Sequence, residues 1–411
     1  MAEPFPREGL PLEEARARVL DALKPMEGRE RLPLSACLGR VSAESCRARE
    51  AVPGFRAAIL DGYAIPETSA PPPTALWRVV GRSAPGAPFF GTLESGQAIR
   101  ILTGAPLPDS AGRVLPQEVV AREGDSLRLR DEAGPNPWIR GAEEEAAPGQ
   151  ELLASGSRLG PADLARLASC GVASLAVRPK PRLGLLISGD ELVPAGEPRR
   201  PGAIWESNGT LLETLLARLG QAVTERRVVP DQPEALGQAL ESLAERCDVV
   251  VSTGGVSAGD ADWIRWLLAE RGEVGFWKLF LKPGRPFAFG QLAGRPFFGL
   301  PGNPVAAAIT ALQLLWPALQ ALEGADPQPL PRLRVRLAAP LKRGAGRPEL
   351  ARARLLVDPC GALLAQVEGS QASSRIGSLQ GADLLVEIPA ERGNLEAGEE
   401  LWAQLLRLPI F

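Results

Sequence analysis

One stretch in the second half of the chain decides how the whole sequence is interpreted, and it reads Asp248-Val249-Val250-Val251-Ser252-Thr253-Gly254-Gly255-Val256-Ser257-Ala258-Gly259-Asp260-Ala261-Asp262. Its β-branched run, bounded by glycine, predicts a short buried strand. The glycine loop that follows lets backbone N–H groups approach a ligand, and a helix is expected to begin at Trp263. Asp260 and Asp262 precede that helix, where an acid either caps the helix or contacts a ligand. The stretch by itself leaves both roles open.

Around this stretch, strands alternate with helices from Arg182 to Leu322. Such alternation predicts a largely parallel sheet with helices on both faces, in which ligands bind beyond the carboxyl ends of the strands. The expected strands are Leu183 to Ile187, Ala222 to Val229, Val249 to Val251, Phe276 to Leu281 and Phe287 to Gly290, and the expected helices are Asn208 to Leu219, Pro233 to Arg246, Trp263 to Glu270 and Pro304 to Leu322.

Polar or glycine-bearing loops follow the expected strands, as a ligand site at this edge requires. Four such loops at one edge are much harder to explain by chance than any one of them. They are Ser188-Gly189-Asp190-Glu191, Pro230-Asp231, Thr253 to Asp262, and Leu300-Pro301-Gly302-Asn303-Pro304.

The remaining chain divides by its hydrophobic pattern. Helical spacing marks Leu12 to Leu23 and Pro161 to Cys170, and we assign residues 1–50 and 138–179 to a linking domain. Residues 51–137 are rich in proline and glycine and predict a small β domain, with residues 180–326 as the α/β domain. Alternating apolar runs after Pro331 predict a terminal β domain over residues 327–411. Within the small β domain the expected strands include Trp77 to Val80, Ala98 to Leu102 and Ser126 to Leu129.

Composition narrows the class of protein. The 411 residues carry 46 basic and 49 acidic side chains, a net charge of -3, which argues against a protein that coats nucleic acid or binds an acidic membrane. No apolar run is expected to be long enough to span a bilayer, and we expect a cytoplasmic protein. The five cysteines form no CxxC pair and histidine is absent, so a metal would be a hard ion held by oxygen.

Cations and acids predict the chemistry of the site. Lys278, Lys282 and Arg285 lie on or just after a strand, the last two around a Pro-Gly turn, and such groups suit phosphate or another oxyanion. Asn303 is expected to cap the helix that starts at Pro304, so that free N–H groups face the ligand. A P-loop and the GxGxxG fingerprint are both absent. The acids on separate loops suit Mg²⁺, which predicts metal-assisted phosphoryl or nucleotidyl chemistry; these acids are Asp61, Glu191, Asp231 and Asp262.

Six motifs in this order resemble the molybdopterin molybdenumtransferase family, of which the gephyrin E domain is a relative. The resemblance extends over nearly the whole chain and includes residues 346–349 and 371–375 of the terminal domain. The motifs are Leu60-Asp61-Gly62-Tyr63-Ala64, Arg100 to Pro106, Ser188-Gly189-Asp190-Glu191-Leu192, Thr253-Gly254-Gly255-Val256-Ser257, Lys282-Pro283-Gly284-Arg285-Pro286 and Leu300-Pro301-Gly302-Asn303-Pro304.

The resemblance implies a multidomain α/β plus β fold. It has a central α/β molybdopterin-binding domain, a small β domain inserted in an N-terminal helical linking domain, and a C-terminal β-barrel-like domain. It also implies an elongated subunit that dimerises, with a site between the α/β domain of one copy and the small β domain of the other. The implied reaction converts adenylylated molybdopterin and molybdate, with Mg²⁺, to molybdenum cofactor and AMP. The adenylyltransferase and molybdoenzyme apoproteins are its candidate protein partners.

The resemblance also implies residue roles. Asp231, Asp262 and Glu191 would bind the metal, with Asp61 close by and Thr103 lining the site. Lys278 and Lys282 would stabilise the leaving phosphate or the molybdate, and the molybdate pocket would be completed by Arg285, Arg352 and one of Ser373 and Ser374. The other implied substrate-binding residues are Gly254, Gly255, Ser257, Pro301, Gly302, Asn303 and Pro304.

The chain departs from the family pattern at three places. It has Arg285 where lysine is usual, Leu60 where methionine is usual, and three glutamates, Glu143 to Glu145, near the usual Gly-Glu-Asp. The longer arm of Glu145 moves its carboxylate by about a bond length, which leaves its role open.

Two other functions compete with this one. A molybdopterin adenylyltransferase would share the α/β domain but needs neither β domain. A non-enzymatic, gephyrin-like dimeric scaffold would have no need of Asp61, Glu191, Asp231 and Asp262, all of which are present.

Overall fold

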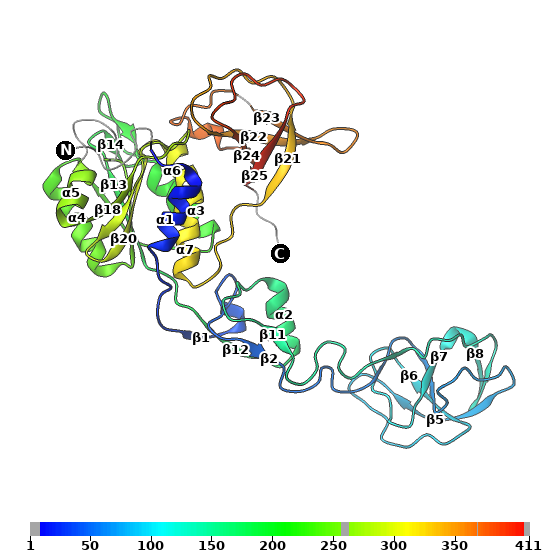
Figure 1. The fold of residues 1–411 in the computed structure, drawn as a ribbon. Coiled ribbons are helices and arrows are strands. Elements are labelled where there is room, and N and C mark those ends of the chain that lie inside the picture. Colours follow the sequence, from blue (N-terminus) through cyan, green and yellow to red (C-terminus); the bar gives the residue numbers. More distant parts are fainter. Residues whose placement is uncertain (1–8, 256–262, 368, 407–411) are drawn as a thin grey trace. The chain divides into compact units, whose positions relative to one another are not determined.

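The computed structural model describes residues 9–255, 263–367 and 369–406. The chain forms two units, drawn in Figure 1. The larger unit comprises Met1–Arg31, Gly39–Ala43 and Ala176–Phe411, and the smaller unit comprises Leu32–Leu38 and Glu44–Leu175. The strands β1 (Glu30–Pro33) and β12 (Ser174–Val177) span points where the chain passes from one unit to the other.

The centre of the larger unit is a sheet whose described strands run in the order β16-β13-β17-β20-β19-β18. Parallel pairing joins the first four of these strands, and antiparallel pairing joins the last two to the rest. The predicted, largely parallel sheet is therefore confirmed. Its strands are β13 (Leu183–Ser188), β16 (Val223–Val229), β17 (Val249–Thr253), β18 (Gly272–Trp277), β19 (Ala288–Leu292) and β20 (Arg295–Leu300), with a separate short pair, β14 (Leu192–Val193) and β15 (Ile204–Trp205).

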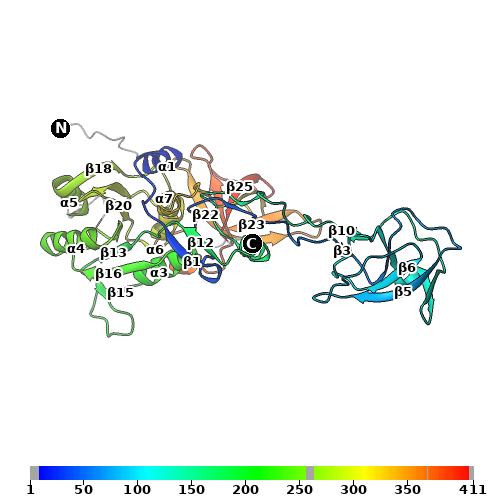
Figure 2. The same ribbon diagram turned by 90° about the horizontal axis from the view of Figure 1, so that it is seen from below.

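Helices cover both faces of this sheet because its central strands are apolar on both faces. Alternate side chains of β13 enter two separate cores: Leu185 packs with α3 and the long α6–α7 helix, and Leu186 packs with α4 and α5. Figure 2 shows the sheet between these two sets of helices. The helices are α1 (Leu12–Asp21), α3 (Asn208–Arg218), α4 (Pro233–Arg246), α5 (Trp263–Arg271), α6 (Pro304–Thr310) and α7 (Trp316–Leu322).

The helix from Pro304 to Leu322 corrects one sequence expectation. It is long and apolar enough to cross a membrane by length and composition, contrary to the prediction that no such run exists. However, 89% of its apolar window is buried inside the protein, as in a core helix. A π-helical turn, η3 (Ala311–Leu315), interrupts it. Pro317 explains the interruption, because proline lacks an N–H and its ring clashes with the carbonyl one turn earlier.

A closed barrel, in the order β21-β23-β22-β24-β25, completes the larger unit and confirms the predicted terminal β domain. It has its own core, which includes Val335, Ala351 and Val386. The first residue of β22 forms a bridge to Lys282, so the barrel is tied to a loop of the α/β domain. The barrel strands are β21 (Arg332–Leu337), β22 (Glu349–Val357), β23 (Leu363–Val367), β24 (Leu384–Ile388) and β25 (Glu400–Leu405), with a 3-10 turn, η4, at Ile376–Ser378.

The smaller unit contains a sheet in the order β7-β4-β6-β5-β9-β8. The predicted strands near Trp77, Ala98 and Ser126 lie in it as β5, β6 and β9. Its strands are β4 (Gly62–Ile65), β5 (Leu76–Ser83), β6 (Gln97–Ile101), β7 (Arg113–Pro116), β8 (Val120–Glu123) and β9 (Ser126–Leu129). The unit also has the helix α2 (Pro161–Ser169), the 3-10 turns η1 (Leu34–Ala36) and η2 (Gln117–Val119), and the short strands β2 (Cys46–Arg47), β3 (Ala57–Ala58), β10 (Ile139–Arg140) and β11 (Glu151–Leu153).

Candidate functional site

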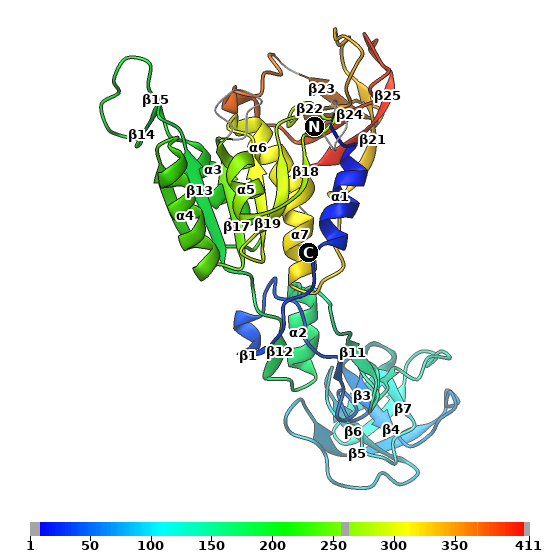
Figure 3. The same ribbon diagram turned by 60° about the vertical axis from the view of Figure 1, so that its left-hand side comes forward.

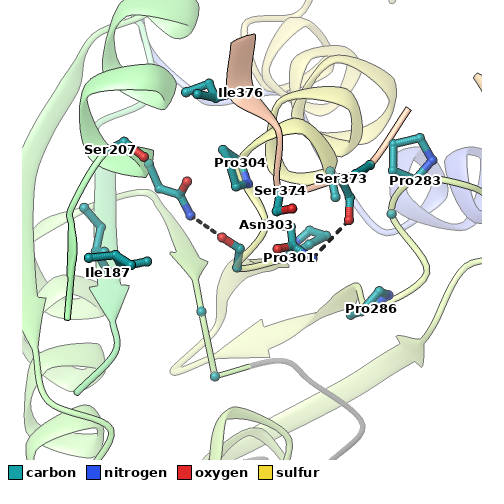
Figure 4. A pocket seen from close by; sticks show the side chains of 18 of the residues that line it. Ile187, Ser207, Pro283, Pro286, Pro301, Asn303, Pro304, Ser373, Ser374 and Ile376 are labelled. Atoms are coloured by element: carbon teal, nitrogen blue, oxygen red, sulfur yellow. Dashed lines mark hydrogen bonds between the residues drawn. The ribbon is translucent and has the colours of Figure 1, made fainter. Parts of the chain in front are cut away.

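A cleft in the larger unit opens at the carboxyl ends of β13, β17 and β20 and has a volume of about 990 Å³. Two more segments contribute to it: the loop from Leu281 to Pro286, and barrel residues that include Ser373 and Ile376. Figure 4 shows several of these side chains around the cleft. The loops that follow separate parallel strands therefore meet at one edge of the sheet, where such folds bind ligands.

Many of the predicted site residues line this cleft. It brings together two acids, two cations, the glycine loop, the Pro-Gly-Asn-Pro segment and one serine of the terminal domain. These residues are Glu191, Asp231, Gly254, Gly255, Lys282, Arg285, Pro301, Gly302, Asn303, Pro304 and Ser373.

Other predicted residues lie elsewhere. Asp61 and Thr103 belong to the smaller unit. Lys278 and Arg352 are not among the described residues that line the cleft. Ser257 and Asp262, like the neighbouring Asp260, lie outside the described residues.

The two glycines that end the quoted stretch are needed for close packing. Gly254 and Gly255 have φ values of 92° and 65°, a region that side chains disfavour. A Cβ on Gly254 would lie 2.3 Å from the carbonyl oxygen of Ser188 at the end of β13. The glycines therefore let the ends of two neighbouring strands approach each other at the floor of the cleft.

Asn208, at the start of α3, joins three loops of the cleft. Its Nδ2 donates to Thr253 Oγ1 at 2.9 Å and to the carbonyl oxygen of Gly302 at 2.7 Å. The Thr253 hydroxyl in turn donates to the Pro301 carbonyl at 3.0 Å. Sequence reasoning missed this residue, because an asparagine at the first turn of a helix resembles an ordinary cap.

Asn303 occupies the N-cap position of α6, but its side chain does not cap the helix. Instead Nδ2 donates to Ser373 Oγ at 3.1 Å, and Figure 4 shows the two side chains pointing toward each other. The carbonyl of Ser373 also accepts the N–H of Val305 at 3.1 Å. The predicted N-cap position of Asn303 and the start of the helix at Pro304 are therefore confirmed. The side chain of Asn303 does not cap the helix, because Ser373 supplies it with another partner, and Ser373 also accepts one of the N–H groups that were expected to be free.

Three cations line the cleft: Lys282, Arg285 and Arg347. Lys282 Nζ lies 3.0 Å from Oε1 of Glu349, whose side chain is 4% exposed, and Arg343 Nε lies 3.2 Å from the other oxygen. Nearly half of the Lys282 side chain remains exposed, so its ammonium can still contact a ligand in the cleft. Sequence reasoning singled out Arg347 only as part of a family motif, although it belongs to this cationic wall.

Asp231 is a carboxylate of the cleft that has a buried oxygen without a hydrogen bond among the described residues. Its backbone N–H donates to Asp190 Oδ1 at 3.1 Å, while its own Oδ1 is buried and accepts no hydrogen bond among the described residues. Burying a charged oxygen without a partner is unfavourable, so a bound cation or a ligand hydrogen would stabilise it. The described residues contain no group of three or more acids, cysteines or histidines that could hold a metal. Mg²⁺ needs only one or two carboxylates, which Asp231 and Glu191 could supply.

The backbone of Lys278 and the side chain of Arg352 form local hydrogen bonds. Lys278 follows β18 with a φ of 69°, and its N–H donates to the Phe287 carbonyl at 2.8 Å. Arg352 is 2% exposed, and this burial lowers the pKa of its guanidinium. Its Nε donates to Ser378 Oγ and its Nη2 to the Ala372 carbonyl, both at 3.2 Å. Arg352 thus holds the segment that carries Ser373 to the cleft, and lines a separate hollow of about 370 Å³.

In the smaller unit, Asp61 and Thr103 form a local pair. Asp61 Oδ1 accepts the Thr103 backbone N–H at 2.8 Å and its hydroxyl at 2.7 Å, and these bonds lower the pKa of the carboxyl group. Glu145 is paired with Arg166, whose Nε lies 3.0 Å from its Oε1. Glu145, whose role the departure from the family pattern left open, therefore has an ion-pair partner.

The fold and the cleft define a class: a multidomain α/β and β protein that presents cations and an incompletely bonded carboxylate to an anionic ligand. Three family models match the chain in order. They are the MoeA N-terminal region (domain I and II) at residues 10–171, a probable molybdopterin binding domain at 184–321, and the MoeA C-terminal region (domain IV) at 334–406.

Similar proteins agree with these models. A molybdopterin molybdenumtransferase of Haemophilus influenzae is 33% identical over 392 residues, which cover 95% of this chain and 97% of that protein. Molybdopterin molybdenumtransferase 2 of Mycobacterium tuberculosis is 31% identical, with 94% and 96% covered. The crystal structure of a molybdopterin biosynthesis MoeA protein from Pyrococcus horikoshii matches with a TM-score of 0.79 at 27% identity, covering 97% of this chain and 100% of that one. The chain belongs to the molybdopterin molybdenumtransferase family.

Proposed function

We propose that this protein transfers molybdenum from molybdate to adenylylated molybdopterin and releases AMP, as the last step of molybdenum cofactor biosynthesis. The observation that carries the proposal is the cleft at the sheet edge, which Lys282, Arg285 and Arg347 line together with the incompletely bonded Asp231. Molybdate and the pyrophosphate link of the substrate are both oxyanions, and this wall suits them.

Each side of the cleft has a role in this proposal. Lys282, Arg285 and Arg347 bind the pyrophosphate oxygens and molybdate, and Ser373 offers a hydroxyl from the barrel side. Arg352 acts as a positioning residue for the segment of Ser373 through its bond to Ala372. Asn208 keeps the loops of Thr253 and Gly302 in register.

The donor set of the cleft fits Mg²⁺, because the buried Oδ1 of Asp231 needs a positive partner. Asp231, Glu191 and Asp262 would hold the ion, of which Asp262 lies outside the described residues. When bound, Mg²⁺ offsets negative charge at a phosphate that is being cleaved.

We also propose a cytoplasmic homodimer in which Asp61 and Thr103 act with the cleft of a second copy. The family resemblance supports this part of the proposal. Asp61 retains exposure and carries a negative charge over the ordinary pH range, since its bonds to Thr103 favour the ionised form.

The direct test is AMP release from adenylylated molybdopterin by the purified protein with Mg²⁺ and molybdate. We expect AMP and molybdenum cofactor to form together, and no AMP from the Asp262→Asn variant although it still binds substrate. Equal loss of binding and turnover in that variant would indicate that Asp262 is a structural cap.

Two controls separate the alternatives. Formation of adenylylated molybdopterin from ATP and molybdopterin would instead indicate an adenylyltransferase. Substrate binding without any AMP release would indicate a scaffold.

A further inference from the structure

A loop of the larger unit carries two exposed apolar side chains to the rim of the cleft. Residues 194–203 connect β14 with β15, and Figure 3 shows this connection extending away from β13. The N–H of Ile204 donates to the Glu191 carbonyl at 2.8 Å and fixes the base of the loop. Ile204 and Trp205 are 50% and 48% exposed, and both line the cleft.

The indole of Trp205 is held in place by its own loop. Nε1 donates to the carbonyl of Glu197 at 2.9 Å, and the guanidinium carbon of Arg199 lies 4.1 Å from the ring centroid. A cation over the face of tryptophan is a favourable contact. The ring is therefore oriented before any ligand arrives, with a guanidinium on one face, and the described residues provide no second aromatic ring against it.

A second exposed tryptophan with an arginine against its ring provides a comparison. Trp402 on β25 is 38% exposed, and two guanidinium groups, those of Arg332 and Arg334, lie 4.8 Å and 4.4 Å from its ring. Among the described residues, Trp205 has one such contact, and it is more exposed and lines the cleft. Single exposed apolar residues need no explanation, but an oriented ring on the rim of a cationic cleft suits a flat ligand.

We propose that Trp205 is a stacking platform for a fused heteroaromatic ring of the ligand whose phosphates bind Lys282 and Arg285. This inference rests on the proposed function, because adenylylated molybdopterin has two flat heterocycles: adenine, and a pterin whose pyrimidine ring is aromatic. Stacking on an aromatic side chain accepts any flat ring, so the shared chemistry is that of a purine-like bicycle attached to phosphate. Trp205 is then a binding residue that sets affinity and leaves the chemical step to other groups.

The test measures binding of three probes to the wild type and to the Trp205→Ala and Trp205→Phe variants by calorimetry. The probes are AMP, a pterin phosphate and inorganic pyrophosphate. We expect Trp205→Ala to weaken either AMP or the pterin phosphate about tenfold or more, because one stacking contact is lost. Which probe weakens identifies the ring. Pyrophosphate should bind equally to all three proteins, and Trp205→Phe should recover most of the lost affinity.

Trp402→Ala provides the matched control, since it also removes an exposed, arginine-stacked tryptophan. It should leave all three affinities within about twofold of the wild type, because two guanidinium groups rather than a ligand cover its ring. The inference is overturned if Trp205→Ala binds both ring-bearing probes as the wild type does. It is also overturned if pyrophosphate binding falls in parallel, since the loop would then be supporting the cleft as a whole.

Kinetics separate this inference from the proposed function. If the wild type releases AMP, Trp205→Ala should raise KM for adenylylated molybdopterin about tenfold with kcat nearly unchanged, as expected for uniform binding. An unchanged KM would contradict the proposal that Trp205 stacks on the substrate, but it would not contradict the proposed reaction. If the wild type releases no AMP, the proposed function fails, and the calorimetric comparison still decides whether Trp205 stacks on a ring.

Discussion

Two aspartates, one in each unit, occupy opposite electrostatic situations. Asp61 of the smaller unit accepts two hydrogen bonds from Thr103 on one oxygen, and these bonds lower the pKa of its carboxyl group. Asp231 of the larger unit has a buried oxygen that accepts none among the described residues. Asp61 is stabilised by hydrogen bonds within its own unit, whereas no described residue donates a hydrogen bond to Oδ1 of Asp231.

The contrast indicates where ligand binding should matter most. A satisfied carboxylate gains little from a cation, since its charge is already solvated by fixed donors and water. A buried oxygen without a partner gains much, because binding removes an existing penalty. Buried charge of this kind at functional sites reduces stability in the absence of ligand.

The largest expected effect follows from neutralising Asp231. We expect Asp231→Asn to lower AMP release by about a hundredfold or more, since a metal-binding carboxylate is lost. Without Mg²⁺, its melting temperature should be at least that of the wild type, because a buried charge has been removed. The wild type should gain about 2.7 kcal/mol at Mg²⁺ a hundredfold above Kd, and the variant should not.

Calorimetry with and without Mg²⁺ measures this difference. Asp125→Asn, on an exposed side chain of the smaller unit, is the control and should behave as the wild type. If Mg²⁺ still stabilised the Asp231→Asn variant, the claim that Asp231 is the carboxylate that needs a bound cation would be wrong.

A second change tests Glu349, the ion-pair partner of Lys282, which lines the cleft together with Asp231. Glu349→Gln should destabilise the larger unit by about 3 kcal/mol, because the nearly buried Arg343 would lose its anionic partner. Glu400→Gln breaks an ion pair with Arg336 at 2.9 Å in which both side chains are more than half exposed. That control should cost less than about 1 kcal/mol. Equal losses in denaturant unfolding would show that burial does not distinguish the two pairs.

A third change loosens the loops of the cleft while leaving its charges in place. Asn208→Ala removes the bonds to Thr253 and Gly302, and we expect a loss of about 2 kcal/mol. Substrate affinity should fall as well, because the loops are no longer held in register. Asn136→Ala removes a comparable bond, to the Trp138 N–H, in the smaller unit. If the Asn136 variant loses as much substrate affinity as the Asn208 variant, Asn208 has no special role in the cleft.

The smallest expected effect is on Asp61. Thr103→Val removes the hydroxyl donor and keeps the backbone donor, which contributes more to lowering the pKa. The pKa of Asp61 should therefore rise part of the way toward its ordinary value, whereas Thr103→Ser should leave it low. Because the folded pKa lies below the unfolded value of about 3.9, the stabilisation is present above that pH and disappears as pH falls through the folded pKa.

Carboxyl NMR titration of the Thr103 variants measures this shift. With valine the loss of stabilisation should be smaller in total and should be complete at a higher pH. An unchanged pKa of Asp61 in the Thr103→Val variant would show that the Thr103 hydroxyl does not lower this pKa.

Most of the larger unit's architecture was predictable from its sequence. The apolar run at Leu183 and the run at Val249 became central parallel strands, and the spacing of leucines after Asn208 became α3. These predictions are correct because a strand buried on both faces requires a continuous apolar run, and a helix buried on one face requires apolar residues at helical spacing. Both patterns can be recognised within a short stretch of sequence. The loops at the strand ends could also be placed at one edge, since parallel strands share their polarity.

The side-chain partners within the cleft were much less predictable. Asn303 was expected to cap α6, yet it bonds to Ser373, which is 70 residues away in the chain. The resemblance assigned Arg352 to the molybdate pocket, but no local pattern predicted its burial or its bond to the Ala372 carbonyl, 20 residues away. Trp205 drew no attention, because one exposed aromatic residue in a Pro-rich and Gly-rich segment has no diagnostic spacing.

The sequence by itself determined the α/β alternation, the two β domains, the glycine loop at the end of β17 and the residue types that suit an oxyanion. The tertiary structure alone decided which polar atoms are hydrogen-bonded. The side chain of Asn303 bonds to Ser373 of the terminal domain, whereas the buried oxygen of Asp231 accepts no hydrogen bond among the described residues. The physical reason is one of range. Periodicity and turn chemistry are local and can be recognised in a few residues, whereas hydrogen bonds and desolvation depend on segments that meet only after folding.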